Sequence, residues 1–342
     1  MLDNLQKLSL AQRRYVFFLI FGGGIFLIIA VTALLISAAL NQRDVPESLS
    51  PSVTVREFAV LPDEDAYPPA AAVLADGTVI TGSFASGAVW SITTDGTVTE
   101  IPGTRDAIGA FTGIAALPDG SVLIIDQEDT DPRSEAGVLW RLQGQTLSEF
   151  TVQGLDERGW VSPNDATVDA QGRIYLSDSG RNEVWRFNLD GSNGAVWWVP
   201  PVNADDPRHA VTGLAYDAIN DALIVTDPEV NRIYRVALAN GDTTVIYDHG
   251  TRQYPPGFDG VDVAPDGTIY VAALGQKGIA RLEDNDLDYI AGLFRNPSDV
   301  VYAMVDGAAR LYVPNFDQSS LVLPFDVPQL PFSVDVIEFT GM

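Results

Sequence analysis

Residues 163–192 read "PNDATVDAQGRIYLSDSGRNEVWRFNLDGS". The stretch holds an Asn-Asp pair, an alternating apolar run, a turn, a second alternating run and a Gly turn. Alternation over four to eight positions is typical of a half-buried strand, and Gly marks the turns between such strands. The stretch is therefore a series of short antiparallel strands, and its meaning depends on whether it occurs once or is repeated.

The same pattern occurs six times, in segments that start at residues 68, 111, 163, 211, 258 and 297. Each segment places a turn residue before its second apolar run: Gly77, Gly120, Gly172, Asp221, Gly267 and Gly307, at intervals of 43, 52, 49, 46 and 40. A repeat of 40 to 50 residues with several short strands is the signature of a β-propeller. The sequence therefore predicts an all-β, six-bladed β-propeller.

Two more alternating segments follow in each of the first five copies, which gives four-stranded antiparallel blades. The sixth copy has a predicted third strand, "LVLPFD" at residues 321–326, and no obvious fourth. Residues 54–61, "TVREFAVL", look like the missing strand, so we expect them to close the ring on blade six and remove a free sheet edge. The propeller is predicted to span residues 53–326. The tail, residues 327–342, contains "VDVIEF", a rival closing strand.

Residues 15–40 carry no charge over 26 positions, more than the roughly 20 residues that cross a bilayer. Three basic residues and one acidic residue precede them, and 17 basic and 45 acidic residues follow. The positive-inside rule predicts a single-pass anchor with a cytoplasmic tail (1–14), a transmembrane helix (15–40), a linker (41–52) and an extracytoplasmic propeller. The competing interpretation is a signal peptide cut near residues 37–39, although its apolar region would be unusually long.

Composition excludes several classes of site. The chain has no Cys, so disulfides, thiolate metal sites and a Cys nucleophile are absent. The strong acidity after residue 14 provides no basic stripe to replace the counterions of DNA or RNA, so we expect no nucleic-acid partner.

The second residue of each copy is predicted to lie at the mouth of the central channel. These residues are Pro69, Thr112, Asn164, Thr212, Asp259 and Ser298. Five of the six bear oxygen, the ligand atom that hard cations such as Ca²⁺ prefer. The alternative is that they cap strand ends and satisfy loop amides.

Two of these segments, "PNDATVDAQGRIYLSDS" and "FDGVDVAPDGTIYVAAL", resemble the metal-site motifs of the senescence-marker-protein/gluconolactonase family. Its members are six-bladed propellers that hydrolyse lactones and related esters with a divalent metal held by a Glu, two Asn and an Asp. The resemblance implies Asn164 and Asp259 as ligands, with Asp259 also the general base. Ca²⁺ is the expected ion, with Zn²⁺ or Mn²⁺ as alternatives.

The chain departs from that pattern at two positions. Thr212 stands where the family has its second Asn, which leaves it as a weak ligand, and the region of the Glu reads "YPPAAAV". The resemblance therefore predicts a membrane-anchored lactone or ester hydrolase with an incomplete ligand set. The alternative function is a non-catalytic propeller of the NHL type that binds an extracytoplasmic protein or glycan, since fold alone does not determine function. A further alternative is another enzyme of the same fold.

Other polar residues lie near the predicted channel mouth. His209 and His249 fall in loops on the same face, and each is a candidate proton shuttle or ligand or simply a loop histidine. Asp165 and Asp299, third in their copies, are expected to point into contacts between blades. The loop at residues 126–137, "DQEDTDPRSEAG", fails the EF-hand pattern and is interpreted as an insertion that walls one side of the mouth.

Overall fold

The computed structural model describes residues 9–40, 43–131, 134–201, 208–324 and 326–340. Its contacts divide the chain into two units, Met1–Arg43 and Asp44–Met342. Parts of the predicted cytoplasmic tail (1–8), linker (41–42) and carboxyl-terminal tail (341–342) lie outside the described residues.

The described residues of the first unit include the helix α2 (Leu10–Leu40). The prediction of a transmembrane helix at residues 15–40 rested on their lack of charge, and the structure does not support it. Among the described residues, no helix is both long and apolar enough to cross a bilayer.

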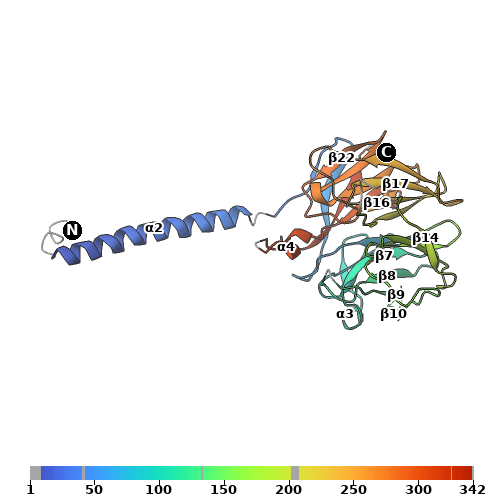
Figure 1. Cartoon of the computed structure of the whole chain (residues 1–342), viewed down its shortest axis with the longest axis horizontal. Coiled ribbons are helices and arrows are strands. Elements are labelled where there is room, and N and C mark those ends of the chain that lie inside the picture. The colour runs from blue at the N-terminus through green and yellow to red at the C-terminus, as the bar shows by residue number, and fades with distance from the viewer. Residues whose placement is uncertain (1–8, 41–42, 132–133, 202–207, 325, 341–342) are drawn as a thin grey trace. The chain divides into compact units, whose positions relative to one another are not determined.

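The second unit consists of six antiparallel sheets, one for each predicted copy, and the six-bladed propeller is confirmed. Blades one to three contain β3 (Ala71–Val73), β4 (Val79–Gly82), β5 (Val89–Ile92) and β6 (Val98–Glu100); β7 (Phe111–Ala116), β8 (Val122–Asp126), β9 (Val138–Gln143) and β10 (Thr146–Glu149); β11 (Pro163–Val168), β12 (Ile174–Asp178), β13 (Glu183–Phe187) and β14 (Ala195–Trp198). Figure 1 shows β7 to β10 as one such blade.

Blades four to six complete the ring. They contain β15 (Leu214–Asp217), β16 (Ala222–Asp227), β17 (Arg232–Ala237) and β18 (Thr243–Asp248); β19 (Phe258–Val263), β20 (Ile269–Ala273), β21 (Gly278–Glu283) and β22 (Asp286–Gly292); β23 (Val301–Val305), β24 (Ala308–Pro314), β25 (Ser333–Phe339) and β2 (Val53–Val60). The connections hold α3 (Thr104–Ala107), a 3-10 turn η1 (Leu274–Gln276) and α4 (Gln318–Val322).

The turns that revealed the repeat have the backbone conformation that the sequence predicts. Gly77, Gly120, Gly172, Gly267 and Gly307 all have φ between +77° and +87°, and Asp221 has φ of +46°. Glycine has no Cβ and adopts positive φ at little steric cost, which is why it marks five of the six turns. Each turn joins the first strand of a blade to its second.

Packing between blades forms the core. Six clusters of buried apolar side chains each join two consecutive blades, and together they run around the whole ring. Between blades two and three, for example, Trp160 meets Trp185 edge to face at 5.4 Å. Full burial of one large apolar side chain contributes about 1.5–3 kcal/mol, so these clusters provide most of the stability of the ring.

The closure of the ring combines both predicted closing strands. β2 is the outer strand of blade six, as expected, and it pairs with β25, which places "VDVIEF" third in the same blade. Figure 1 shows the blue amino-terminal strands beside the orange and red carboxyl-terminal ones. The predicted third strand at residues 321–326 is wrong: its first two residues end α4, and residue 325 lies outside the described residues. The propeller therefore extends to Phe339 rather than residue 326.

A buried arginine holds the segment that runs from α4 to β25. Arg295 is 1% exposed and donates to the carbonyl oxygens of Gln329 at 2.7 Å and Pro331 at 2.6 Å. It also donates to the hydroxyl of Ser333, the first residue of β25. The guanidinium thus fixes the segment that leads into the closing strand. The residues before β1 (Glu47–Ser48) lie close by, since Lys277 Nζ meets Asp44 Oδ2 at 2.6 Å.

Candidate functional site

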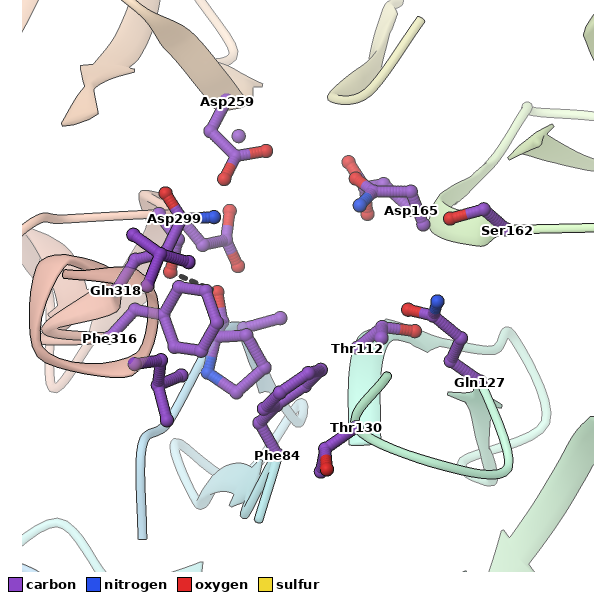
Figure 2. Close-up of a pocket in the computed structure, with 17 residues that line it drawn as sticks. Phe84, Thr112, Gln127, Thr130, Ser162, Asp165, Asp259, Asp299, Phe316 and Gln318 are labelled. Atoms are coloured by element: carbon purple, nitrogen blue, oxygen red, sulfur yellow. Dashed lines mark hydrogen bonds between the residues drawn. The ribbon is translucent and has the colours of Figure 1, made fainter. Parts of the chain in front are cut away.

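A cavity of about 620 Å³ opens at the mouth of the central channel. Five of the six predicted ring residues line it: Pro69, Thr112, Asn164, Asp259 and Ser298. Figure 2 shows Asp259, Asp165 and Asp299 around the same open space, with Phe84 and Phe316 on one side and Thr112, Gln127 and Thr130 on another. The size is ordinary for a small-molecule site.

β-Bulges place the two family-type residues in this cavity. The register between β11 and β12 shifts between Pro163 and Ala166, and that between β19 and β20 shifts between Phe258 and Val261. A bulge leaves its extra residues outside the regular ladder and redirects their side chains. Asn164 and Asp259 each lie within such a bulge, so the local backbone releases both side chains from the sheet.

Hydroxyl groups around the mouth hold the blades to one another. Thr112 Oγ1 donates to the carbonyl oxygen of Pro163 at 3.1 Å, and Ser298 Oγ donates to that of Pro69 at 2.5 Å. Thr226 Oγ1 makes the same kind of bond to Asp259 at 2.5 Å. Each bond joins one blade to the next, so several oxygen-bearing residues near the mouth have a structural role.

The carboxylates of Asp165 and Asp299 also join neighbouring blades, as predicted. Asp165 accepts from its neighbour Ala166 N at 2.7 Å and from Leu214 N of the next blade at 2.7 Å. Asp299 accepts from Val300 N at 2.8 Å and from Ala71 N of the next blade at 3.0 Å. Both oxygens of each carboxylate are thus occupied by backbone N–H groups.

Asp262 repeats this arrangement deeper in the channel. It accepts from Val263 N at 2.7 Å and from Tyr302 N of blade six at 2.7 Å. It lines a second cavity of about 210 Å³, which shares Asp165 and Asp299 with the mouth cavity. These two carboxylates therefore border both cavities.

Asp259 differs from these three carboxylates. Among the described residues, its carboxylate has no hydrogen-bond partner, and only its backbone carbonyl is bonded. Burial, with a smaller contribution from the charge of Asp299, raises the pKa of Asp259 to about 8. The Asn164 amide also has no partner among the described residues and faces the same cavity. A carboxylic acid with such a pKa exchanges its proton near neutral pH.

The other channel carboxylates are also hard to ionise. Burial raises the pKa of Asp262 to about 7 and that of Asp299 to about 6. Burial is also the main reason that the pKa of Asp165 is raised well above its ordinary value, and the charges of Asp299 and Asp259 raise it further. Clusters of perturbed acids in a cavity are characteristic of functional sites.

Three predicted site residues lie outside the lining of the mouth cavity. The Thr212 hydroxyl is buried against Thr226 Oγ1 at 3.1 Å. His209 Nδ1 meets Asp227 Oδ2 at 2.7 Å, which holds the ring against blade four. His249 is buried between the Tyr247 hydroxyl at 3.0 Å and the Arg252 carbonyl at 3.1 Å. The two histidines are therefore held away from Asn164 and Asp259. Thr212 meets Asp259 only through Thr226, whose hydroxyl also bonds to the Asp259 carbonyl oxygen.

The loop at residues 126–137 does wall the cavity, through Gln127 and Thr130, although residues 132–133 lie outside the described residues. The opposite wall was not predicted. It consists of Phe84 and Phe316, whose rings meet edge to face at 5.6 Å. In the sequence, copies one and six end in "GSF" and "PNF", whereas none of the other four copies ends in an aromatic residue.

Residues 104–313 match the family model described as the SMP-30/Gluconolactonase/LRE-like region. The chain belongs to this family. A search of curated protein sequences finds no match.

Several solved structures share the fold of this SMP-30/gluconolactonase/LRE-like propeller. A gluconolactonase from Xanthomonas campestris is 15% identical with a TM-score of 0.61, over 86% of this chain and 95% of that one. A luciferin-regenerating enzyme is 13% identical with a TM-score of 0.59, over 87% and 96%. Virginiamycin B lyase from Staphylococcus aureus is 15% identical with a TM-score of 0.56, over 85% and 100%. At these identities the likeness shows the fold alone.

The donor groups of the cavity do not complete the four-ligand metal site that the family resemblance implies. Asn164 and Asp259 line the cavity together, but Thr212 does not, and Pro69 and Ala70 stand near the position of the Glu. Among the described residues, no group of three or more His, Cys, Asp or Glu side chains is arranged to hold a metal ion. Hard cations require six or more oxygen ligands, of which protein side chains normally supply several.

Proposed function

We propose that this propeller hydrolyses small lactones or esters, with the channel-mouth cavity as its active site. The observation that carries the proposal is the Asp259 carboxylate. It faces a cavity of about 620 Å³, has no partner among the described residues, and has a pKa raised to about 8 by burial. A general base is most effective when its pKa lies near the working pH.

In the proposed reaction, ionised Asp259 takes a proton from a water molecule, and the oxygen of that water attacks the carbonyl carbon of the substrate. The C–O bond to the ring oxygen, or to the alcohol of an ester, then breaks. The proton passes from Asp259 to the departing oxygen, which gives an alcohol and a carboxylic acid and returns the base to its ionised form. The Asn164 amide, which has no partner in the described part of the chain, is placed to donate a hydrogen bond to the oxygen that becomes negative.

The test is a lactone and ester screen with the wild-type chain, Asp259→Asn and Asp284→Asn. Asp284 is exposed and has φ of +46°, a conformation that Asn adopts readily, so it is a matched control for the loss of one charge. We expect Asp259→Asn to lower kcat/KM at least 100-fold, the usual effect of losing a general base, and Asp284→Asn to leave it unchanged. Hydrolysis that survives Asp259→Asn would contradict the proposal.

The alternative is a non-catalytic propeller that binds a protein or glycan at its channel mouth. It is favoured by one observation, the incomplete set of family metal ligands at Thr212 and Pro69. Absence of turnover on every lactone and ester in the screen, together with binding of an extracytoplasmic partner that Asp259→Asn weakens, would favour this alternative.

A divalent metal at Asn164 and Asp259 stays a prediction. Calorimetric titration of Ca²⁺, Zn²⁺ and Mn²⁺ into chelator-treated protein tests it, with Asp259→Asn as the comparison. One-to-one binding that the variant abolishes would support a metal site despite the missing ligands. Absent binding, or binding that Asp259→Asn leaves unchanged, would exclude this pair as its centre.

The location of the protein is a separate proposal that rests on the sequence. We propose that the propeller is extracytoplasmic, because the charges on either side of residues 15–40 follow the positive-inside rule. Protease added to intact spheroplasts should then digest the propeller. Protection until the membrane is lysed would contradict the proposal.

A further inference from the structure

The mouth cavity has two chemically different regions. One wall is apolar: Phe84 and Phe316 meet edge to face, and Leu321 and Val322 of α4 continue it towards solvent, where they are 39% and 63% exposed. The deeper part presents the carboxylates of Asp165, Asp259 and Asp299, which Figure 2 shows around one space. A ligand that fills the cavity therefore contacts both an apolar surface and a group of acids.

No positive side chain balances these acids within the cavity. Among its described lining residues there is no Lys, Arg or His. Asp165 and Asp299 are compensated only by two backbone N–H groups each, and Asp259 by none of the described groups. Opposite charges attract much more strongly in a partly enclosed site than in bulk water, so this site favours a cation and disfavours an anion.

We propose that the cavity selects small ligands that carry an ammonium group close to an apolar group. The ammonium lies among Asp165, Asp259 and Asp299, and the apolar group lies against Phe84 and Phe316. In terms of the proposed hydrolysis, on which this inference rests, the substrate class is an amine-bearing lactone or ester. A carboxylate or phosphate ester would be excluded by the same acids.

The test uses three probes with one carbon skeleton: 4-phenylbutylamine, 4-phenylbutanol and 4-phenylbutyrate. Binding to the full chain at pH 7.5 is measured by calorimetry, where the amine is a cation and the acid an anion. We expect the amine to bind at least about tenfold more tightly than the alcohol, and the carboxylate to bind most weakly, since a buried ion pair is sensitive to the sign of the charge. Equal affinities for the three probes would overturn the proposal.

Two variants assign the effect to the cavity. Asp259→Asn should lower the affinity for the amine about tenfold and leave that for the alcohol unchanged, whereas the matched control Asp284→Asn should change neither. Phe84→Leu should weaken the amine and the alcohol by the same factor, because both place the phenyl group on that wall. An equal loss in Asp259→Asn and Asp284→Asn would show that net charge alone attracts the amine, which contradicts the proposal.

The outcomes also separate this inference from the proposed function. Preference for the amine without turnover of any lactone or ester would reject the hydrolase and keep the charge selection. Turnover of neutral lactones by wild-type protein, lost in Asp259→Asn, without preference for amines would keep the hydrolase and reject the charge selection.

Discussion

Asp299 and Asp259 lie at the same channel mouth and are both half-buried acids, yet their surroundings differ. Each oxygen of Asp299 accepts a backbone N–H, one from its own blade and one from the next. The Asp259 carboxylate has no such partner among the described residues and faces the cavity. The comparison teaches that hydrogen bonding, more than burial or residue type, separates a structural carboxylate from one available for chemistry.

The third position of each copy lies where neighbouring blades approach closely. Asp299 and Asp165 occupy the third position of their copies, where three other copies have glycine. A Cβ at Gly213 would collide with the carbonyl oxygen of Asp259, and one at Gly260 would collide with Asp299. Inner strands pack this closely because each blade must contact the next around a narrow channel. The third position is therefore small, Gly or Ala70, in four copies, and in the other two it is an Asp that bonds across the gap.

The largest effect is expected from Asp299→Ala. The substitution leaves the N–H groups of Val300 and Ala71 without their acceptor, and each buried unsatisfied group costs about 1–3 kcal/mol. We expect the free energy of unfolding to fall by about 2–4 kcal/mol in total. Urea unfolding followed by fluorescence measures this, with Asp259→Ala as the comparison because it removes no acceptor. Equal losses in the two variants would break the distinction between them.

A smaller effect of opposite sign is expected from Asp259→Asn. The folded-state pKa of Asp259, about 8, lies above its unfolded value near 3.8, so the folded state binds the proton more tightly. Its contribution to stability is complete below about pH 4 and is lost as the pH rises towards 8. Asn resembles the neutral acid and avoids this loss. At pH 8 we expect the variant to be more stable by at least about 1 kcal/mol, a rise of at least about 2–4 °C in Tm.

The pH dependence provides the control for that variant. At pH 5, only slightly above the unfolded value near 3.8, little of this loss has developed, so Asp259→Asn should raise the Tm much less than it does at pH 8. Differential scanning calorimetry at both pH values measures the change. A variant that is equally stabilised at pH 5 and pH 8, or destabilised at pH 8, would contradict the raised pKa.

The smallest effect on stability is expected from Asn164→Ala. The Asn164 amide has no partner among the described residues, so its removal should change the free energy of unfolding by less than about 0.5 kcal/mol. In the proposed hydrolysis it should still lower kcat about 100-fold, because a donor to the developing oxyanion is lost. A loss of stability comparable to that of Asp299→Ala would assign Asn164 to blade contacts instead.

The sequence predicted those parts of the fold that repeat locally. Strands joined by Gly turns were recognised because each blade forms from about 45 adjacent residues. The residues of β25 were recognised as a possible closing strand, but their place as the third strand of blade six was not predicted. That place is fixed by Arg295 and by pairing with β2, which lies about 280 residues away in the chain. Such long-range contacts have no local signature in the sequence.

The site was predicted in part for a similar reason. Asn164 and Asp259 were predicted to lie at the channel mouth because they lie in recognisable motifs, and both line the cavity. Asp165 and Asp299 bond across blades as predicted, but they also line the cavity, which was not expected. His209 and His249 are close in sequence to inner strands, but hydrogen bonds to Asp227 and Tyr247 turn them away from the cavity. The aromatic wall comes from blades one and six, which only the closed ring brings together.

The most direct measurement of the central claim is the pKa of Asp259 itself. The carboxyl carbons of aspartate are labelled with ¹³C, and spectra of the wild-type chain and Asp259→Asn are compared across pH 4 to 10. A single resonance that is absent from the variant and titrates near pH 8 would agree with an unpartnered, buried base. A resonance that titrates near 3.8 would contradict it, because Asp259 would then be an ordinary ionised carboxylate.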